Sequence, residues 1–115
     1  MESNSLLSGS FESGLSLNAL FTIIKQRFER THIRESAHYE SGQYIRTDFG
    51  HEGYITFEKI NSKEYLIRAD AELPGDLLQL ATILDKVLKE NQVNLIFEVY
   101  DRFNNLYASD KIKRE

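Results

Sequence analysis

The sequence contains no cysteine. This absence excludes disulfide bonds, thiolate nucleophiles, cysteine-ligated zinc and iron–sulfur clusters. Small secreted domains usually depend on disulfides, so the absence favours a reducing compartment, and we expect the protein to act in the cytoplasm. The first 17 residues have neither the basic nor the continuous apolar region of a signal peptide. No stretch approaches the roughly 20 apolar residues of a membrane-spanning helix, so we expect no membrane association.

Positive charge is also scarce. The chain has 18 acidic and 14 basic residues, a formal net charge of −4 and a pI near 5.4. Nucleic-acid binding usually needs an excess of lysine and arginine to displace counterions, so a nucleic-acid partner is not expected. One segment is locally basic: it contains Lys25, Arg27, Arg30 and Arg34, and Glu29 is the only acidic residue among them. We interpret it as a solvated helix face, with binding to an acidic partner as the alternative.

The sequence contains none of the motifs that identify common catalytic sites. G-x-S-x-G, the P-loop and G-x-G-x-x-G are absent, so acyl transfer, nucleotide binding and dinucleotide binding have no support. Asp70, Glu72 and Asp76 fall where an expected strand meets an expected helix, and carboxylates at such a corner can bind Mg²⁺ or Ca²⁺. Their spacing matches no calcium loop, so we favour a solvated acidic corner and expect no metal or cofactor.

Three histidines are the remaining candidates for acid–base or metal chemistry: His32, His38 and His51. None lies in a metal-binding pattern such as H-E-x-x-H, and His51 stands in a glycine-flanked turn beside Glu52. We interpret the three as surface residues. The alternative is a small metal-dependent or hydrolytic enzyme that uses His38 or His51 with nearby carboxylates.

The chain has the size and composition of one globular domain, with 115 residues, 41% of them hydrophobic and 28% charged. Serine and glycine are frequent in residues 1–16, so we expect a flexible arm there. Three apolar residues could still dock this arm on the domain: Leu6, Leu7 and Phe11. We expect the folded domain over residues 17–109 and a charged, frayed tail over residues 110–115.

Two segments have the apolar spacing of amphipathic helices. Over residues 17–30, apolar side chains recur at three- and four-residue steps, and Ser16 is placed to cap the first turn. The second helix is expected to begin at Pro74, because proline suits the first turn, and to stop near Asn91. Its apolar stripe is wide and contains Leu77, Leu80, Ala81, Leu84, Val87 and Leu88.

The other segments have the pattern of strands separated by short turns. The expected strands cover residues 32–40, 43–49, 54–60, 64–70 and 93–100, with a shorter one at 106–108. Short turns between consecutive strands predict an antiparallel meander. The order is therefore helix, four strands, helix, and one or two strands. We predict an α+β two-layer sandwich in which both helices cover one face of an antiparallel sheet of about five strands.

Tyrosine is concentrated in the expected sheet, because all six tyrosines fall in or near its strands. Alternation along the strands places one set of residues on the face away from the helices: Tyr44, Arg46, Asp48, Tyr54, Thr56, Glu58 and Arg68. Tyrosine and arginine anchor many protein interfaces, because they bury a large area yet keep a polar end. The alternative is that these residues are ordinary cross-strand pairs on a solvated sheet.

These observations favour a non-enzymatic protein-binding module. We expect a small acidic inhibitor or immunity-type protein that masks another macromolecule, with another protein bound at the seven residues of the sheet face. A homodimeric accessory or scaffold domain is a further alternative, since an open antiparallel sheet has a face and edges that a second copy can use.

Overall fold

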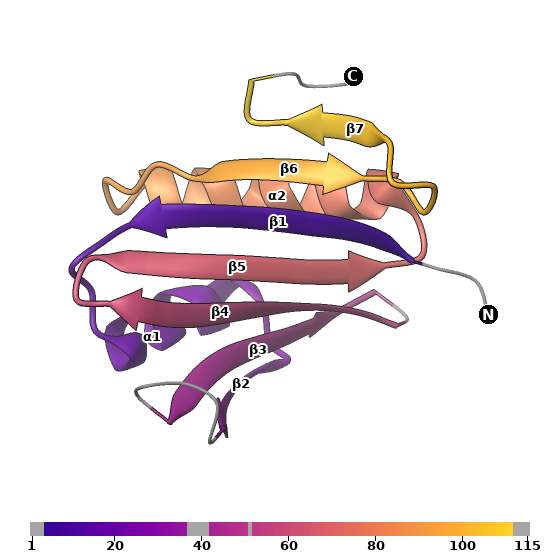
Figure 1. Ribbon diagram of the computed structural model, residues 1–115. Coiled ribbons are helices and arrows are strands. Elements are labelled where there is room, and N and C mark those ends of the chain that lie inside the picture. The colour runs from indigo at the N-terminus through magenta and orange to yellow at the C-terminus, as the bar shows by residue number, and fades with distance from the viewer. Residues whose placement is uncertain (1–3, 37–41, 51, 112–115) are drawn as a thin grey trace.

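The computed structural model describes residues 4–36, 42–50 and 52–111 (Figure 1). In chain order, their elements are β1 (Ser5–Glu12), α1 (Leu17–Arg27), β2 (Thr31–Glu35), β3 (Gln43–Phe49), β4 (Gly53–Asn61), β5 (Glu64–Ala71), α2 (Pro74–Lys89), β6 (Ile96–Tyr100) and β7 (Leu106–Ser109). The expected class, an α+β fold with an antiparallel sheet and two helices, is confirmed. No helix within these ranges is both long and apolar enough to cross a membrane.

All seven strands belong to one antiparallel sheet with the order β2-β3-β4-β5-β1-β6-β7. The N-terminal strand β1 lies in the interior of this sheet, paired with β5 on one side and β6 on the other (Figure 1). It therefore joins the meander β2–β5 to the C-terminal pair β6–β7. The prediction of about five strands, with a helix as the first element, is wrong in both strand number and element order.

The segment from Ser5 to Glu12 forms a strand because its alternate side chains face the core. Ser5, Leu7 and Phe11 are almost completely buried. Gly9 belongs to the same set, and a Cβ atom there would lie only 2.6 Å from the carbonyl oxygen of Ile96. Small residues are needed here for close packing. This finding corrects the expectation of a flexible arm for the part of residues 1–16 that forms β1.

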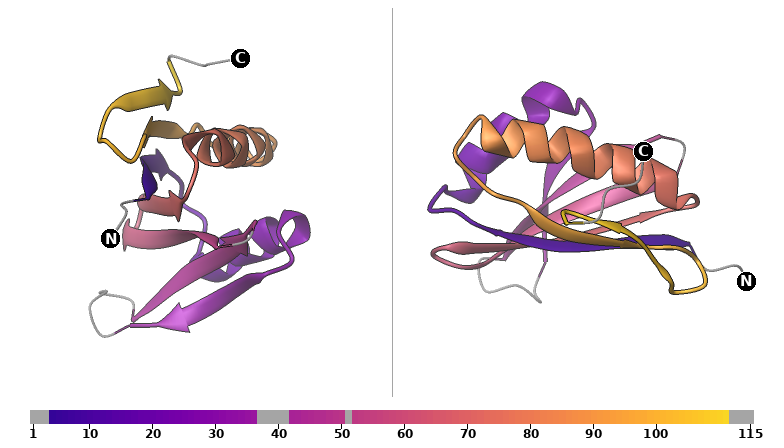
Figure 2. Two further views of the ribbon diagram at one scale, coloured as in Figure 1. Left: turned by 90° about the vertical axis from the view of Figure 1, so that its right-hand side faces the viewer. Right: turned by 90° about the horizontal axis from the view of Figure 1, so that it is seen from above.

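Both helices pack on the same side of the sheet, so the molecule has two layers (Figure 2). Ser16 caps α1 as expected, since its hydroxyl accepts a hydrogen bond from the Ala19 amide at 3.1 Å. α2 begins at Pro74 as expected. Its buried residues are Leu77, Leu80, Ala81, Leu84 and Leu88. These apolar stripes and the inward side chains of the strands form one core.

One buried polar pair fixes the edge of the sheet beside α1. The hydroxyls of Thr31 in β2 and Thr47 in β3 lie 2.9 Å apart. The Thr31 hydroxyl also donates to the carbonyl oxygen of Phe28 at 2.6 Å. Because both hydroxyls are paired, burying them costs little. The pair ties the end of α1 to the two outermost strands of the meander.

Candidate functional site

The sheet face turned away from both helices is called the open face below. All seven residues predicted to share a face lie on it, because the strand register brings them together. Arg46 is opposite Thr56, and Thr56 is opposite Arg68. Asp48 is opposite Tyr54. Tyr44 and Glu58 extend the same alternation along β3 and β4.

Arg46, Tyr54 and Asp48 form a small cluster on the open face. The guanidinium carbon of Arg46 lies 4.4 Å from the centroid of the Tyr54 ring, within the range of a cation–π contact. Its Nη2 atom donates to Asp48 Oδ1 at 3.1 Å. The Arg46 and Asp48 side chains are still about one-third exposed. The guanidinium is therefore held in place while remaining accessible to a partner.

Charges on the open face are ordered in rows across the strands. One row joins residues opposite each other in register: His32, Arg46, Thr56, Arg68, Ser8 and Glu98. The neighbouring row runs through Asp48, Tyr54, Asp70, Leu6 and Tyr100. Basic groups thus lie beside carboxylates over β3–β5, so the polar half of the face carries a pattern of both signs.

The other half of the open face carries two exposed apolar side chains among polar ones, and the sequence analysis missed it. Leu6 and Ile96 remain 49% and 59% exposed. A shallow depression of about 300 Å³ lies beside them, with Ser8, Ser10 and Leu66 in its lining together with the charged residues Glu98, Asp110 and Lys111. These residues were missed because β1 was not predicted as a strand. The usable signal was the period-two spacing of Ser5, Leu7, Gly9 and Phe11.

Two tyrosines have a raised pKa, and burial is the largest cause for both. Burial raises the pKa of Tyr65 to about 12. Its hydroxyl donates to the carbonyl oxygen of Leu15 at 2.6 Å, so the residue is a structural anchor in the core. Partial burial, then a hydrogen bond with Glu98 and the negative charge of that carboxylate, raise the pKa of Tyr100. Tyr100 therefore presents a protonated phenol on the open face.

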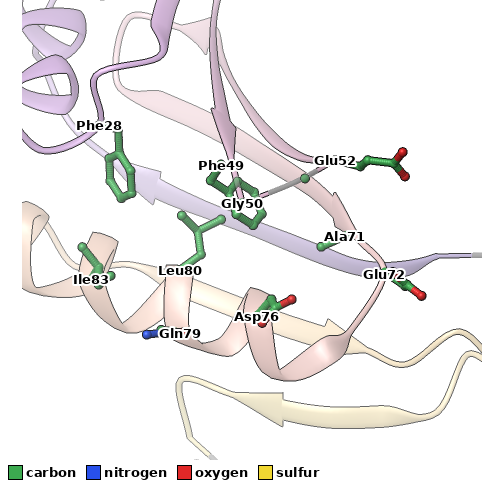
Figure 3. A pocket seen from close by; sticks show the side chains of 11 residues that line it. Phe28, Phe49, Gly50, Glu52, Ala71, Glu72, Asp76, Gln79, Leu80 and Ile83 are labelled. Carbon is green, nitrogen blue, oxygen red and sulfur yellow. The ribbon is translucent and has the colours of Figure 1, made fainter.

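A second candidate site lies on the opposite side of the sheet, between α2 and the β3–β4 hairpin (Figure 3). It is a pocket of about 300 Å³. Its apolar lining comes from Phe28, Phe49, Ala71, Leu80 and Ile83. Its acidic lining comes from Glu52, Glu72 and Asp76. The sequence analysis did not bring these residues together, because they come from four separate segments of the chain.

The structure does not unite the candidate metal ligands. The predicted acidic corner is divided by the sheet: Asp70 lies on the open face, whereas Glu72 and Asp76 line the pocket on the helix side. His38 and His51 lie outside the described residues. His32 lies on the open face opposite Arg46. Among the residues that the structure describes, no group of three or more histidine or carboxylate side chains is arranged to hold a metal ion.

Comparison with known proteins gives no family assignment. No protein family, no curated protein and no solved structure matches this chain. Function must therefore be argued from the two sites themselves.

Proposed function

We propose that this chain is a non-enzymatic binding module that docks another protein against the open face of its sheet. One observation carries the proposal. A positioned Arg46–Tyr54–Asp48 cluster shares one sheet face, which carries neither helix, with the half-exposed side chains of Leu6 and Ile96. Arginine and aromatic residues beside apolar area are typical of the energetically important centres of protein interfaces.

The preordered side chains support binding more than they support stability. An exposed ion pair contributes only about 0–1 kcal/mol to folding. An arginine already held by Tyr54 and Asp48 loses less side-chain freedom when a partner arrives, and that loss costs about 0.5–1.5 kcal/mol for a flexible side chain. The cluster therefore favours association at this position over association elsewhere on the surface.

The order of the charges indicates the chemistry of the partner. Arg46 and Arg68 stand in one row, beside a row that contains Asp48 and Asp70. A complementary protein surface would place carboxylates over Arg46 and Arg68, and apolar side chains over Leu6 and Ile96. The finer assignment, a small cytoplasmic inhibitor that masks its partner, belongs to the same proposal and is supported by the small acidic chain and its lack of cysteine.

A capture experiment tests the proposal. Wild-type protein and a Tyr44→Ala, Arg46→Ala, Tyr54→Ala variant are each incubated with a cytoplasmic lysate of the source cell, and bound proteins are identified by mass spectrometry. We expect one stoichiometric partner that the wild type captures and the variant does not. The purified partner should then bind the variant at least tenfold more weakly.

The matched control is a variant that also carries three alanine substitutions, on the helix side of the molecule. Gln26, Thr82 and Lys86 are exposed on α1 and α2, and their replacement by alanine should leave capture unchanged. Equal loss in both variants would mean that the open face has no special role. The homodimer alternative requires that the partner is a second copy of the chain. Light scattering of the wild type over a range of concentrations would then show a dimer.

A further inference from the structure

The pocket between α2 and the β3–β4 hairpin is polarised along its length (Figure 3). Phe28 and Ile83 lie at one end. The acidic side chains of Glu72 and Asp76 lie at the other end, where β5 passes into α2. The volume of about 300 Å³ is at the lower limit of small-molecule pockets, which measure about 300–1,000 Å³. The size suits a compact molecule with one ring or a short alkyl chain.

A glycine allows the close packing of the Phe49 ring in the apolar lining of the pocket. A Cβ atom at Gly53 would lie 2.7 Å from two carbons of the Phe49 ring, so the ring occupies the space over this glycine. Leu80 and Ala71, both buried, complete the wall across the pocket. An apolar group that enters here exchanges water for aromatic and aliphatic contacts.

The acidic end has an excess of negative over positive charge. Glu52, Glu72 and Asp76 are exposed, and none of them forms an ion pair with a residue of the described ranges. The N-terminus of α2 supplies only about half a unit of positive charge. Arg30 adds one positive charge, because its Nη2 atom donates to the carbonyl oxygen of the lining residue Gly50 at 2.9 Å. Three carboxylates against these two contributions still leave a net negative charge at the mouth of the pocket.

We infer that this pocket binds a small protonated amine that carries an aromatic or short aliphatic group. The ammonium lies at the mouth beside Asp76, within the negative field of Glu52 and Glu72, and the apolar group lies against Phe28 and Phe49. An anion of the same shape is repelled by the carboxylates. A bare metal ion leaves the apolar end unused, and an uncharged ring leaves the acidic end without a counterion. The pocket and the open face lie on opposite sides of the sheet, so this inference does not depend on the protein-binding proposal.

Titration of isotope-labelled full-length protein with 2-phenylethylamine, followed by amide NMR spectra, tests the inference. We expect saturable shifts centred on the amides of Gly53, Glu72 and Leu80. The affinity should fall with added salt, because exposed charges are screened. Two matched probes separate the contributions: 3-phenylpropionate keeps the ring and reverses the charge, and ethylamine keeps the charge without the ring. Both should bind at least tenfold more weakly than 2-phenylethylamine.

A charge-neutral variant completes the test. Glu52→Gln, Glu72→Gln and Asp76→Asn preserve side-chain shape at exposed positions, so folding should persist, and its retention is checked by circular dichroism. Each exposed ion pair is worth about two- to fivefold in affinity, so the triple variant should lose about tenfold or more for the amine. Equal binding of the amine and the carboxylate, unchanged amine binding by the variant, or no saturable shifts in the wild type would each overturn the inference.

Discussion

The Arg46 guanidinium lies across the Tyr54 ring, with its central carbon 4.4 Å from the ring centroid. The two residues sit on adjacent strands, one step diagonal in register, since Arg46 faces Thr56 and Tyr54 faces Asp48. Asp48 holds the guanidinium from the other side. The most ordered part of the open face is thus built from residues of one hairpin, and its geometry depends on the β3–β4 register.

A double-mutant cycle should measure this contact. Arg46→Ala, Tyr54→Ala and the double variant, unfolded in urea, should give a coupling free energy of about 0.5–1 kcal/mol, as expected for a partly exposed cation–π pair. Tyr54→Phe keeps the ring and should retain most of the coupling. A coupling near zero would mean that the two side chains are not associated in solution.

Alanine at Gly9 should destabilise the protein. Its Cβ would meet the Ile96 carbonyl oxygen at 2.6 Å and the Ile67 side chain at 3.0 Å, so β1 must shift against β6 or β5. Overpacking of this kind costs about 1–3 kcal/mol. Gly14→Ala is the matched control, because no atom lies within 4 Å of its added Cβ. Equal free energies of unfolding for the two variants would contradict the close approach of β1 and β6.

Alkaline pH should destabilise the fold through Tyr65. Its pKa is raised to about 12 in the folded state from the ordinary value of 10.0, so the folded state keeps the phenol proton longer. The stabilising contribution is therefore complete below pH 10 and is lost as the pH rises toward 12. We expect a decrease on the order of 2 kcal/mol across this window.

Tyr65→Phe is the control for this effect. Without the Tyr65 hydroxyl, the Leu15 carbonyl oxygen still accepts a hydrogen bond from Lys59 Nζ at 2.8 Å. The substitution should therefore lower the free energy of unfolding at neutral pH by only about 1 kcal/mol. Urea unfolding at neutral and alkaline pH, together with ultraviolet titration of the phenols, provides the measurement. A Tyr65 phenol that titrates near pH 10, or a Phe variant with undiminished alkaline sensitivity, would be inconsistent with burial of this hydroxyl.

Deletion of residues 1–12 should abolish cooperative folding. β1 pairs with β5 through eight residues and with β6 through five, and it separates the meander from the C-terminal strands. Without it, Leu7 and Phe11 are removed from the core, and β5 and β6 each lose one of their two pairing partners. Circular dichroism during heating should show no sharp transition. A truncated chain that melts like the full chain would show that β1 is dispensable.

The meander could be predicted because its signals are local. β3 begins and ends at the residues expected from the alternation between Gln43 and Phe49, since the turns on either side contain glycine. β1 could not be recognised, because its composition is that of a flexible segment and its partners are far away in sequence. Phe11 lies opposite Tyr65, and Leu7 lies opposite Val99. Only these long-range contacts turn the serine and glycine positions into a strand.

The two sites differ in the same respect. Seven residues of the open face could be grouped from the sequence, because β3, β4 and β5 follow each other through short turns and alternation fixes their faces. The pocket could not be assembled, because Phe28 follows α1, Phe49 ends β3 and Asp76 lies in α2. These side chains are brought together by three-dimensional packing, which no periodicity along the chain indicates.

Site-specific photo-cross-linking tests the central claim most directly. A photoreactive residue replaces Ser8, which is exposed on the open face between Arg68 and Glu98 in register, or Thr82, which is exposed on α2. After irradiation in the source cell, the account predicts one cross-linked protein from position 8 and none from position 82. Cross-linking of the same protein from position 82 alone, or no protein from position 8, would contradict binding at the open face.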